Sequence, residues 1–341
     1  MKIGILTGGG DCPGLNPVIR AVVRKAELEN QEVVGLRYGW KGLIEKDTLA
    51  LNVRSVSGIL HRGGTILGTS RTNPYNKEGD SKKAIANFKE LGLDALISIG
   101  GEDTLGAATK LFKEGLNTVG VPKTIDNDLG ATDFTFGFDT AVNIVTECLD
   151  RLHTTAESHN RIMVVEVMGR HAGWIATYSG IAGGADYILI PETPIDIGEV
   201  CQSIKKRHER GKNFSIVVVA EGAFFKNENV ALQEKKLDAF GHVRLGGIGH
   251  TLGNMIEKKT GYETRVTVLG HIQRGGSPSA FDRVLGTRFG IKAYELVRDG
   301  KFGRMASLRG NQIVDVSLEE ATSKLKTVDK NIYDIAKIFF G

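Results

Sequence analysis

The sequence has 341 residues, with 44 Lys and Arg against 40 Asp and Glu, a formal net charge of +4 and 44 glycines; this small charge argues against a nucleic-acid-binding surface or a polybasic membrane anchor. The three cysteines, Cys12, Cys148 and Cys201, are too few and too widely spaced for a disulfide framework or a structural zinc site. No apolar run reaches the ~18 residues of a membrane span, and the chain becomes Gly-rich after Thr7, before a signal-peptide core could form, so we expect a cytoplasmic protein.

Short β-branched runs alternate with amphipathic helical patterns along the chain. In chain order, the predicted strands cover residues 2–7, 32–36, 95–99, 118–121, 162–167, 187–190, 215–220, 265–269 and 312–316. The predicted helices cover residues 15–29, 82–91, 105–114, 141–158, 171–181, 197–209, 250–259, 279–298 and 329–340. This alternation, with fully apolar strands, is typical of parallel sheets buried on both faces. The predicted fold class is therefore α/β, doubly wound, with ligands at the carboxyl ends of strands.

One stretch departs from this alternation. Residues 224–241 (FFKNENVALQEKKLDAFG) are mostly polar and charged, which predicts a solvated excursion. We find no Pro- or Ser-rich linker, low-complexity tract or internal repeat that would divide the chain elsewhere.

The first candidate site is the turn TGGGDCPG at residues 7–14, between a predicted strand and a predicted helix. Three consecutive glycines let the backbone approach a ligand, and their amides together with the helix start suit a phosphate. The spacing matches neither GxGxxG nor GxxxxGK[ST], so it supports neither a dinucleotide site nor a P-loop. Taken alone, the turn could equally be a tight structural connection.

A second glycine turn, SIGGEDT at residues 98–104, carries two carboxylates at a strand end. Glu102 and Asp103 could simply favour the start of the next helix. A carboxylate in this position is also a natural Mg²⁺ ligand beside phosphate oxygens.

The third candidate is VPKTIDND at residues 121–128, directly after a buried strand. Asp126 and Asp128 stand two residues apart, and Lys123 precedes the first by three. This combination supplies a base, a metal or hydroxyl partner and a phosphate counter-charge within one loop. A helix cap alone would not need all of these groups.

A fourth group is basic and is found mostly at the ends of predicted strands: Arg71, Arg161, Arg170, Arg265 and Arg274. Guanidinium groups hold phosphates through paired hydrogen bonds. A single Arg is usually a surface charge, but five of them together with two glycine turns favour a substrate that carries phosphate.

These motifs together resemble one family. The ordered set TGGGDCPGLN, RGGTILGTSR, GGEDT, PKTIDND, MGRHAGW, AEG and GHIQRGGSP is similar to 6-phosphofructokinase, of the short bacterial type, over nearly the whole length. The resemblance implies two doubly wound, mostly parallel-sheet domains with the active site in the cleft between them. We expect a donor domain from residues 1–138 plus about 250–302, and a sugar-phosphate domain from 139–249 plus about 303–341.

Two positions make the chain similar to the pyrophosphate-dependent branch. ATP-using members typically carry Gly at the position of Asp103 and often Gly at that of Lys123. A carboxylate at Asp103 would take the space, and repel the charge, of an α-phosphate, which ATP has and pyrophosphate lacks. Lys123 would supply charge to the transferring phosphoryl group. The predicted reaction is phosphoryl transfer from pyrophosphate to fructose 6-phosphate, and the ATP-dependent enzyme is the alternative.

The resemblance also implies a role for each matching residue. Asp126 would be the general base, with Asp128 beside it and with Arg71 and Lys123 as the other catalytic residues. Donor binding would fall to Gly9, Gly10, Asp103, Thr104 and Lys123. Glu102 would bind Mg²⁺, although many relatives have Asp there. Fructose 6-phosphate would contact Thr124, Asp126, Arg161, Met168, Gly169, Arg170, Glu221, Arg265, His271 and Arg274.

In this family Arg161 and Arg265 would reach a neighbouring subunit's substrate, which implies a homodimer or homotetramer with shared active sites. Two other classes fit less of the sequence. A lipid or NAD kinase shares a GGDGT-like turn, and this resemblance covers only that loop. A non-catalytic phosphosugar sensor would not need Asp126 or a metal carboxylate.

Overall fold

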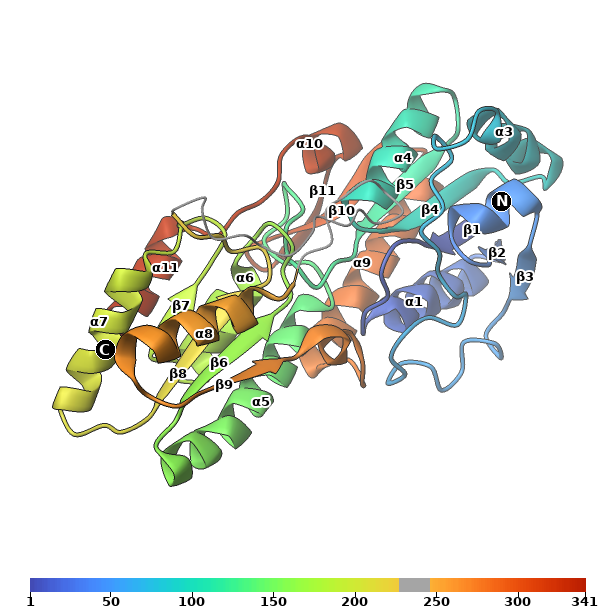
Figure 1. Cartoon of the computed structure of the whole chain (residues 1–341). Coiled ribbons are helices and arrows are strands. Elements are labelled where there is room, and N and C mark those ends of the chain that lie inside the picture. Colours follow the sequence, from blue (N-terminus) through green and yellow to red (C-terminus); the bar gives the residue numbers. More distant parts are fainter. Residues whose placement is uncertain (227–245) are drawn as a thin grey trace. The chain divides into compact units, whose positions relative to one another are not determined.

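The computed structural model describes residues 1–226 and 246–341; most of the predicted excursion over 224–241 lies outside them. The chain forms two compact units (Figure 1). The first unit comprises Met1–Ile125, Leu129–Thr140 and Arg274–Leu325, and the second comprises Asp126–Asp128, Ala141–Gln273 and Lys326–Gly341. Each unit holds its own mostly parallel sheet, which confirms the predicted α/β class.

In the first unit, the described strands form a sheet with the order β11-β10-β5-β4-β1-β2-β3. Their bounds are β1 (Lys2–Thr7), β2 (Glu32–Leu36), β3 (Thr48–Leu51), β4 (Ala95–Gly100), β5 (Thr118–Pro122), β10 (Arg304–Arg309) and β11 (Gln312–Ser317). The five inner strands run parallel, and β3 and β11 pair antiparallel at the two edges. Every residue of β4 and β5 is buried, as expected for strands covered on both faces.

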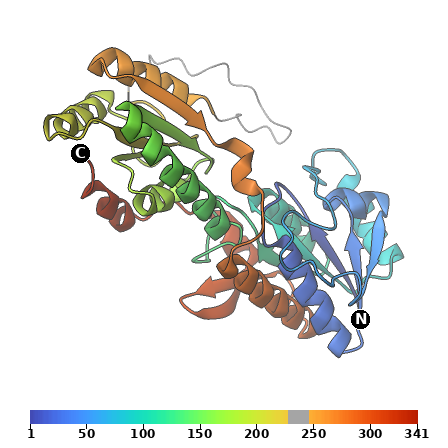
Figure 2. The ribbon, with the colours of Figure 1, turned by 90° about the horizontal axis from the view of Figure 1, so that it is seen from below.

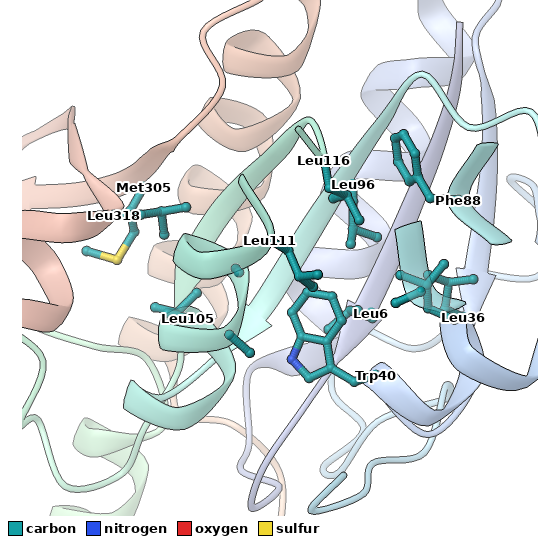
Figure 3. Packing of buried hydrophobic residues seen from close by; sticks show 14 of the residues in the cluster. Leu6, Leu36, Trp40, Phe88, Leu96, Leu105, Leu111, Leu116, Met305 and Leu318 are labelled. Carbon is teal, nitrogen blue, oxygen red and sulfur yellow. The ribbon is translucent and has the colours of Figure 1, made fainter. Parts of the chain in front are cut away.

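The helices of the first unit are α1 (Leu15–Leu28), α2 (Trp40–Glu45), α3 (Asp80–Glu90), α4 (Glu102–Lys113), α9 (Ala280–Arg298) and α10 (Leu318–Ser323). One large apolar cluster joins α2, α3, α4 and α10 to the sheet. Figure 3 shows Trp40, which is 2% exposed, among the leucines of this cluster. Each large apolar side chain buried in this way stabilises the fold by about 1.5–3 kcal/mol.

Helices α1 and α9 lie side by side in both views of the ribbon (Figures 1 and 2). Glycines of α9 allow this close packing. A Cβ on Gly286 would lie 3.0 Å from Gly14 O, and one on Gly290 would lie 2.7 Å from Val18 O. The packing fixes the start of α1, and with it the end of the first glycine turn.

In the second unit, the described strands form a parallel sheet with the order β7-β8-β6-β9. Their bounds are β6 (Ile162–Val167), β7 (Tyr187–Leu189), β8 (Ser215–Ala220) and β9 (Thr264–Val268). The other elements are α5 (Phe138–His159), α6 (Trp174–Ala182), α7 (Ile197–Glu209), α8 (Ile248–Thr260), the 3₁₀ helix η1 (Gly270–Arg274) and α11 (Lys330–Lys337). The first three residues of α5, and Arg274 of η1, belong to the first unit.

A buried carboxylate fixes the start of α8. Glu166, in β6, is 2% exposed and accepts hydrogen bonds from Gly247 N (3.0 Å) and Gly249 N (2.8 Å). The otherwise unsatisfied amides at the helix start are the natural partners of a negative charge. Across the described residues, no helix combines the length and the apolar character needed to span a bilayer.

The division of the chain differs from the predicted domains in two places. Residues 250–273, expected in the donor domain, belong to the second unit, because β9 pairs with β6. Residues 303–325, expected in the sugar-phosphate domain, belong to the first unit, because β10 pairs with β5. Strand pairing between distant segments decides both boundaries, and no local sequence pattern reports it.

Candidate active site

The first glycine turn lies at the carboxyl edge of the first unit's sheet, where β1 and β4 are neighbours. Gly8 N donates to Ile99 O over 2.9 Å, which ties the turn to β4. Gly9 has φ +76°, a left-handed conformation that glycine adopts without strain. After β1 the chain continues to β2, and after β4 it continues to β5, so the two connections lead in opposite directions along the strand order. This edge is therefore a topological switch point, the usual ligand position in open α/β sheets.

Thr104, in the first turn of α4, packs directly against the glycines. A Cβ on Gly8 would lie 2.6 Å from Thr104 Oγ1, and a Cβ on Gly100 would lie 2.3 Å from Thr104 Cβ. A larger residue at either glycine would therefore push α4 away. The glycines bring the start of α4, with its N-terminal backbone amides and positive dipole end, up to the turn.

The two acidic residues of the second glycine turn are the first two residues of α4. Gly101 takes the N-cap position, without a side-chain cap, so Glu102 and Asp103 are not caps. Glu102 is exposed and Asp103 is half-buried. Among the described residues, no three or more His, Cys, Asp or Glu side chains are grouped to hold a metal. One exposed carboxylate fits Mg²⁺, which commonly completes its octahedron with water and substrate phosphate oxygens.

Lys123 joins the third loop to the glycine turn. Its side chain is 3% exposed, and its Nζ donates a hydrogen bond to Gly10 O. The same Nζ lies 3.6 Å from the place of a Cβ on Gly9. The next residue, Thr124, is also buried, and its carbonyl accepts from Thr135 Oγ1 over 2.7 Å. The structure thus brings Lys123 together with Gly9 and Gly10.

Arg71 follows a segment that is bonded to the same turn. Gly9 N donates to Ser70 O over 3.2 Å, and Thr69 Oγ1 donates to Gly9 O over 2.6 Å. Arg71, the next residue, is exposed. These bonds place Arg71 near the turn. The sequence analysis overlooked Thr69 and Ser70, although both lie in the GTSR motif beside Arg71.

Arg274 also lies on the glycine turn. Its Nη1 donates to Asp11 O over 3.2 Å, and a Cβ on Gly10 would lie 2.3 Å from it. Sequence analysis grouped Arg274 with His271 around the sugar phosphate. The structure assigns Arg274 to the first unit and His271 to the second, so the two ends of this short motif belong to different units.

Two titratable side chains, one in the turn and one near it, are buried. Cys12 Sγ donates to Phe136 O over 3.7 Å, and burial raises the pKa of this thiol to about 12. Cys12 is therefore a protonated packing residue and not a nucleophile. Asp282 Oδ2 accepts from Thr140 N over 2.9 Å, and burial raises the pKa of this carboxyl to about 6. Asp282 thus holds the first turn of α5 through Thr140.

Asp126 and Asp128 lie in a buried loop of the second unit, with exposures of 3% and 6%. Asn127, between them, has φ +51°. Lys326 holds this loop: its Nζ donates to Asn127 Oδ1 over 3.0 Å, and its N donates to Asp128 O over 2.8 Å. Trp174 Nε1 in turn donates to Lys326 O over 2.9 Å. Sequence analysis overlooked Lys326, which is far from the loop in sequence and stands in no recognisable motif.

The predicted sugar residues gather at the carboxyl ends of β6 and β8. Glu221 N donates to Val167 O over 2.8 Å, and Arg170 N donates to Glu221 Oε1 over 3.2 Å. Gly169 has φ +141° and Arg170 has φ +51°, so the chain turns sharply here. Met168 and Arg170 are half-buried. The structure therefore brings together Met168, Gly169, Arg170 and Glu221.

His271 lies at the same edge of this sheet, in η1 directly after β9, and is exposed. A buried neighbour, Gln273, connects η1 to the sugar residues, because its Oε1 accepts from Met168 N over 3.2 Å. Three strand ends of the second unit thus supply one cluster of polar groups.

Arg161 and Arg265 lie at the opposite end of this sheet. Arg161 precedes β6, and Arg265 is the second residue of β9. Both pair with Glu263, Arg161 over 2.9 Å, and the hydrogen bond from Arg161 holds the pKa of Glu263 below its ordinary value. At about 3.3 Å per residue, the length of β6 separates Arg161 from Met168 by roughly 20 Å. The structure does not bring these two arginines to the sugar residues of their own unit.

Comparison with known proteins agrees with these observations. The phosphofructokinase family matches residues 2–297. A pyrophosphate–fructose 6-phosphate 1-phosphotransferase of Streptomyces coelicolor is 59% identical, with full coverage of both chains. The same organism's ATP-dependent 6-phosphofructokinase 3 is 55% identical over 96% of both chains. Relatives with different donors are therefore similar to this chain at almost equal levels.

A solved structure carries the same fold. The phosphofructokinase of Saccharomyces cerevisiae superposes with a TM-score of 0.81 at 32% identity, over 99% of this chain. This chain spans 46% of the length of that yeast chain.

Proposed function

This chain belongs to the phosphofructokinase family, and from that premise we propose that it transfers a phosphoryl group from pyrophosphate to the 1-hydroxyl of fructose 6-phosphate. The products are fructose 1,6-bisphosphate and phosphate. One observation carries the choice of donor: the Lys123 ammonium rests on the glycine turn, in the unit where the carboxylate Asp103 stands in the first turn of α4. The S. coelicolor relative at 59% identity bears the name of this activity.

The first unit carries the groups for the donor. Gly9 and Gly10, without side chains, let pyrophosphate approach the backbone closely, Thr104 holds α4 against the glycine turn, and Lys123 and Arg71 stabilise charge on the moving phosphoryl group. Asp103 leaves no space for an α-phosphate. Glu102 would hold Mg²⁺, which would supply positive charge next to the phosphate oxygens.

The second unit carries the groups for the acceptor. The sugar O1 attacks phosphorus, the bridging P–O bond of pyrophosphate breaks, and phosphate leaves with the bonding electrons. Asp126 takes the hydroxyl proton as general base. Asp128 follows it in the same unit, and Thr124, which precedes it in sequence, belongs to the first unit.

The sugar itself is bound at the strand ends of the second unit, by Met168, Gly169, Arg170 and Glu221. Its 6-phosphate is bound by His271 and Arg274, and by Arg161 and Arg265 of a neighbouring subunit. A homo-oligomer, a cytoplasmic location and a place in glycolysis and gluconeogenesis accompany this function.

A donor assay tests the proposal. We expect rapid fructose 6-phosphate phosphorylation with pyrophosphate and Mg²⁺, and very slow reaction with ATP. Because pyrophosphate hydrolysis releases less free energy than ATP hydrolysis, the reverse reaction should also run readily, making pyrophosphate from fructose 1,6-bisphosphate and phosphate. A preference for ATP would make the chain an ATP-dependent enzyme. No turnover with either donor would remove the kinase assignment.

A second prediction concerns shared active sites. Arg161 and Arg265 lie roughly 20 Å from the sugar residues of their own unit, so we expect them to complete a neighbour's site. Arg265→Ser should raise KM for fructose 6-phosphate about 10–100-fold through loss of charge-assisted hydrogen bonds. Mixing this variant with Asp126→Ser after reversible dissociation should restore activity, because hybrids contain some intact sites.

Arg309→Ser is a matched control, since Arg309 is an exposed arginine paired with Glu320 over 3.3 Å. This change should leave KM unaltered. A fully active monomer, or hybrids without recovered activity, would contradict site sharing.

A further inference from the structure

Gln273 is a fully buried amide in the segment that carries His271. Its exposure is 0%. Its Oε1 accepts from Met168 N over 3.2 Å, and its Nε2 donates to Gly270 O over 3.0 Å. Both halves of the amide are therefore in use, one on the sugar loop and one on η1.

These bonds continue a connection that the sheet begins. The pairing of β6 with β9 ends at Glu166 and Val268, and Leu269 N then donates to Glu166 O over 3.1 Å. Beyond that point the two strands leave the ladder. The Gln273 side chain accepts the hydrogen bond from Met168 N that a backbone carbonyl of β9 would accept if the ladder continued, and so keeps η1 joined to Met168.

The loop that Gln273 holds is not a relaxed extended chain. Arg170 has φ +51°, which is unfavourable for a residue with a side chain. Side-chain oxygens hold two alternate amides of this loop: Gln273 accepts from Met168 N, and Glu221 accepts from Arg170 N over 3.2 Å. Without the bond from Met168 N to Gln273, the loop loses a hydrogen bond that joins it to η1, the helix that carries His271.

We propose that Gln273 is a positioning residue for the sugar: it fixes the loop 168–170 relative to the turn that carries His271, and thereby sets the affinity for fructose 6-phosphate. The inference rests on the proposed function. The site needs an amide because one partner is an N–H and the other a carbonyl. An ionised carboxylate would accept from Met168 N but would repel Gly270 O.

The experiment compares two isosteric variants across pH, using the ratio of each variant's KM to that of the wild type at the same pH. Gln273→Met removes both bonds without adding charge, so its KM for fructose 6-phosphate should rise about tenfold at every pH. KM for pyrophosphate should change less than twofold.

In Gln273→Glu, the ionised carboxylate should raise the sugar KM at pH 8. Burial and the facing carbonyl raise the pKa of such a carboxyl. Protonation near pH 6 therefore restores a hydrogen-bond donor to Gly270 O, and the ratio of the variant's sugar KM to that of the wild type should fall.

Asn87 supplies the matched control. It is a buried amide of α3 in the first unit, and its Nδ2 donates to Leu43 O (3.0 Å) and Ile44 O (2.8 Å). Asn87→Leu and Asn87→Asp should lower the melting temperature and leave both KM values unchanged.

The outcomes are distinguishable. Gln273→Met with a wild-type sugar KM, or with equal rises in both KM values, would make Gln273 a structural residue only. If Gln273→Met does not fold, a pH-independent KM ratio in Gln273→Glu would overturn the inference. A wild-type protein without turnover of fructose 6-phosphate would instead contradict the proposed function.

Discussion

Asp126→Ser should lower kcat by ~10²–10⁴, the usual contribution of a positioned general base, and leave KM for fructose 6-phosphate within a few-fold of the wild type. The sugar hydroxyl is a poor nucleophile until its proton is removed, and serine cannot accept that proton at neutral pH. Steady-state kinetics with pyrophosphate in both directions would measure the loss, because the same carboxyl must return the proton in reverse.

Asp186→Ser is the control for loss of a buried carboxylate. Asp186 lies in the second unit, accepts from Ile216 N over 2.9 Å and pairs with Arg207 over 2.9 Å. Its removal should lower the free energy of unfolding without a comparable fall in kcat. Turnover near the wild-type value in Asp126→Ser would eliminate Asp126 as the base.

Asp103→Gly should give the protein measurable activity with ATP. At an effective dielectric constant of about 20, a carboxylate about 5 Å from an α-phosphate costs roughly 3 kcal/mol. Relief of that repulsion corresponds to a gain of ~10² in kcat/KM for ATP. Replacing Lys123 as well should weaken pyrophosphate use further, because the donor loses a counter-charge. Parallel assays with the two donors would measure the switch.

Two further variants separate the causes. Asp103→Asn keeps the bulk and removes the charge, so any ATP activity it gains reports repulsion rather than space. Asp80 occupies the same kind of position in α3, in the first turn after a glycine N-cap. Asp80→Gly should cost about 0.3–1 kcal/mol of stability and leave donor choice unchanged. If Asp103→Gly gains no ATP activity, another residue excludes the nucleotide.

Much of the fold could be predicted because most of the inner strands, such as β4 and β8, are short apolar runs. Sequence analysis overlooked α2, β3, β10 and α10. Two of these are six-residue helices and one is a four-residue edge strand, too short to show a period. β10 was overlooked although four of its six residues are buried, and its pairing with β5 places residues 303–325 in the first unit.

A candidate site could be predicted where one motif carries several chemical groups, as in VPKTIDND at residues 121–128. It was not predictable where a single side chain serves a distant segment. Gln273 and Lys326 each bond through a side chain to a predicted site segment from far along the chain. These contacts have no local signature, even though Gln273 stands in a motif, because they are defined only by the pairing of strands and loops in space.

The pairing of β10 with β5 has a consequence for synthesis. A ribosome completes β5 at residue 122 but does not reach β10 until residues 304–309. At 5–20 residues per second, this interval lasts roughly 10–40 s. Throughout it, β5 is an open edge of an apolar sheet, the kind of surface that recruits strands from other chains. We therefore expect nascent chains of this protein to depend on chaperone protection of the β5 edge, and rapid overproduction to lead to aggregation even though the finished sheet has this edge covered.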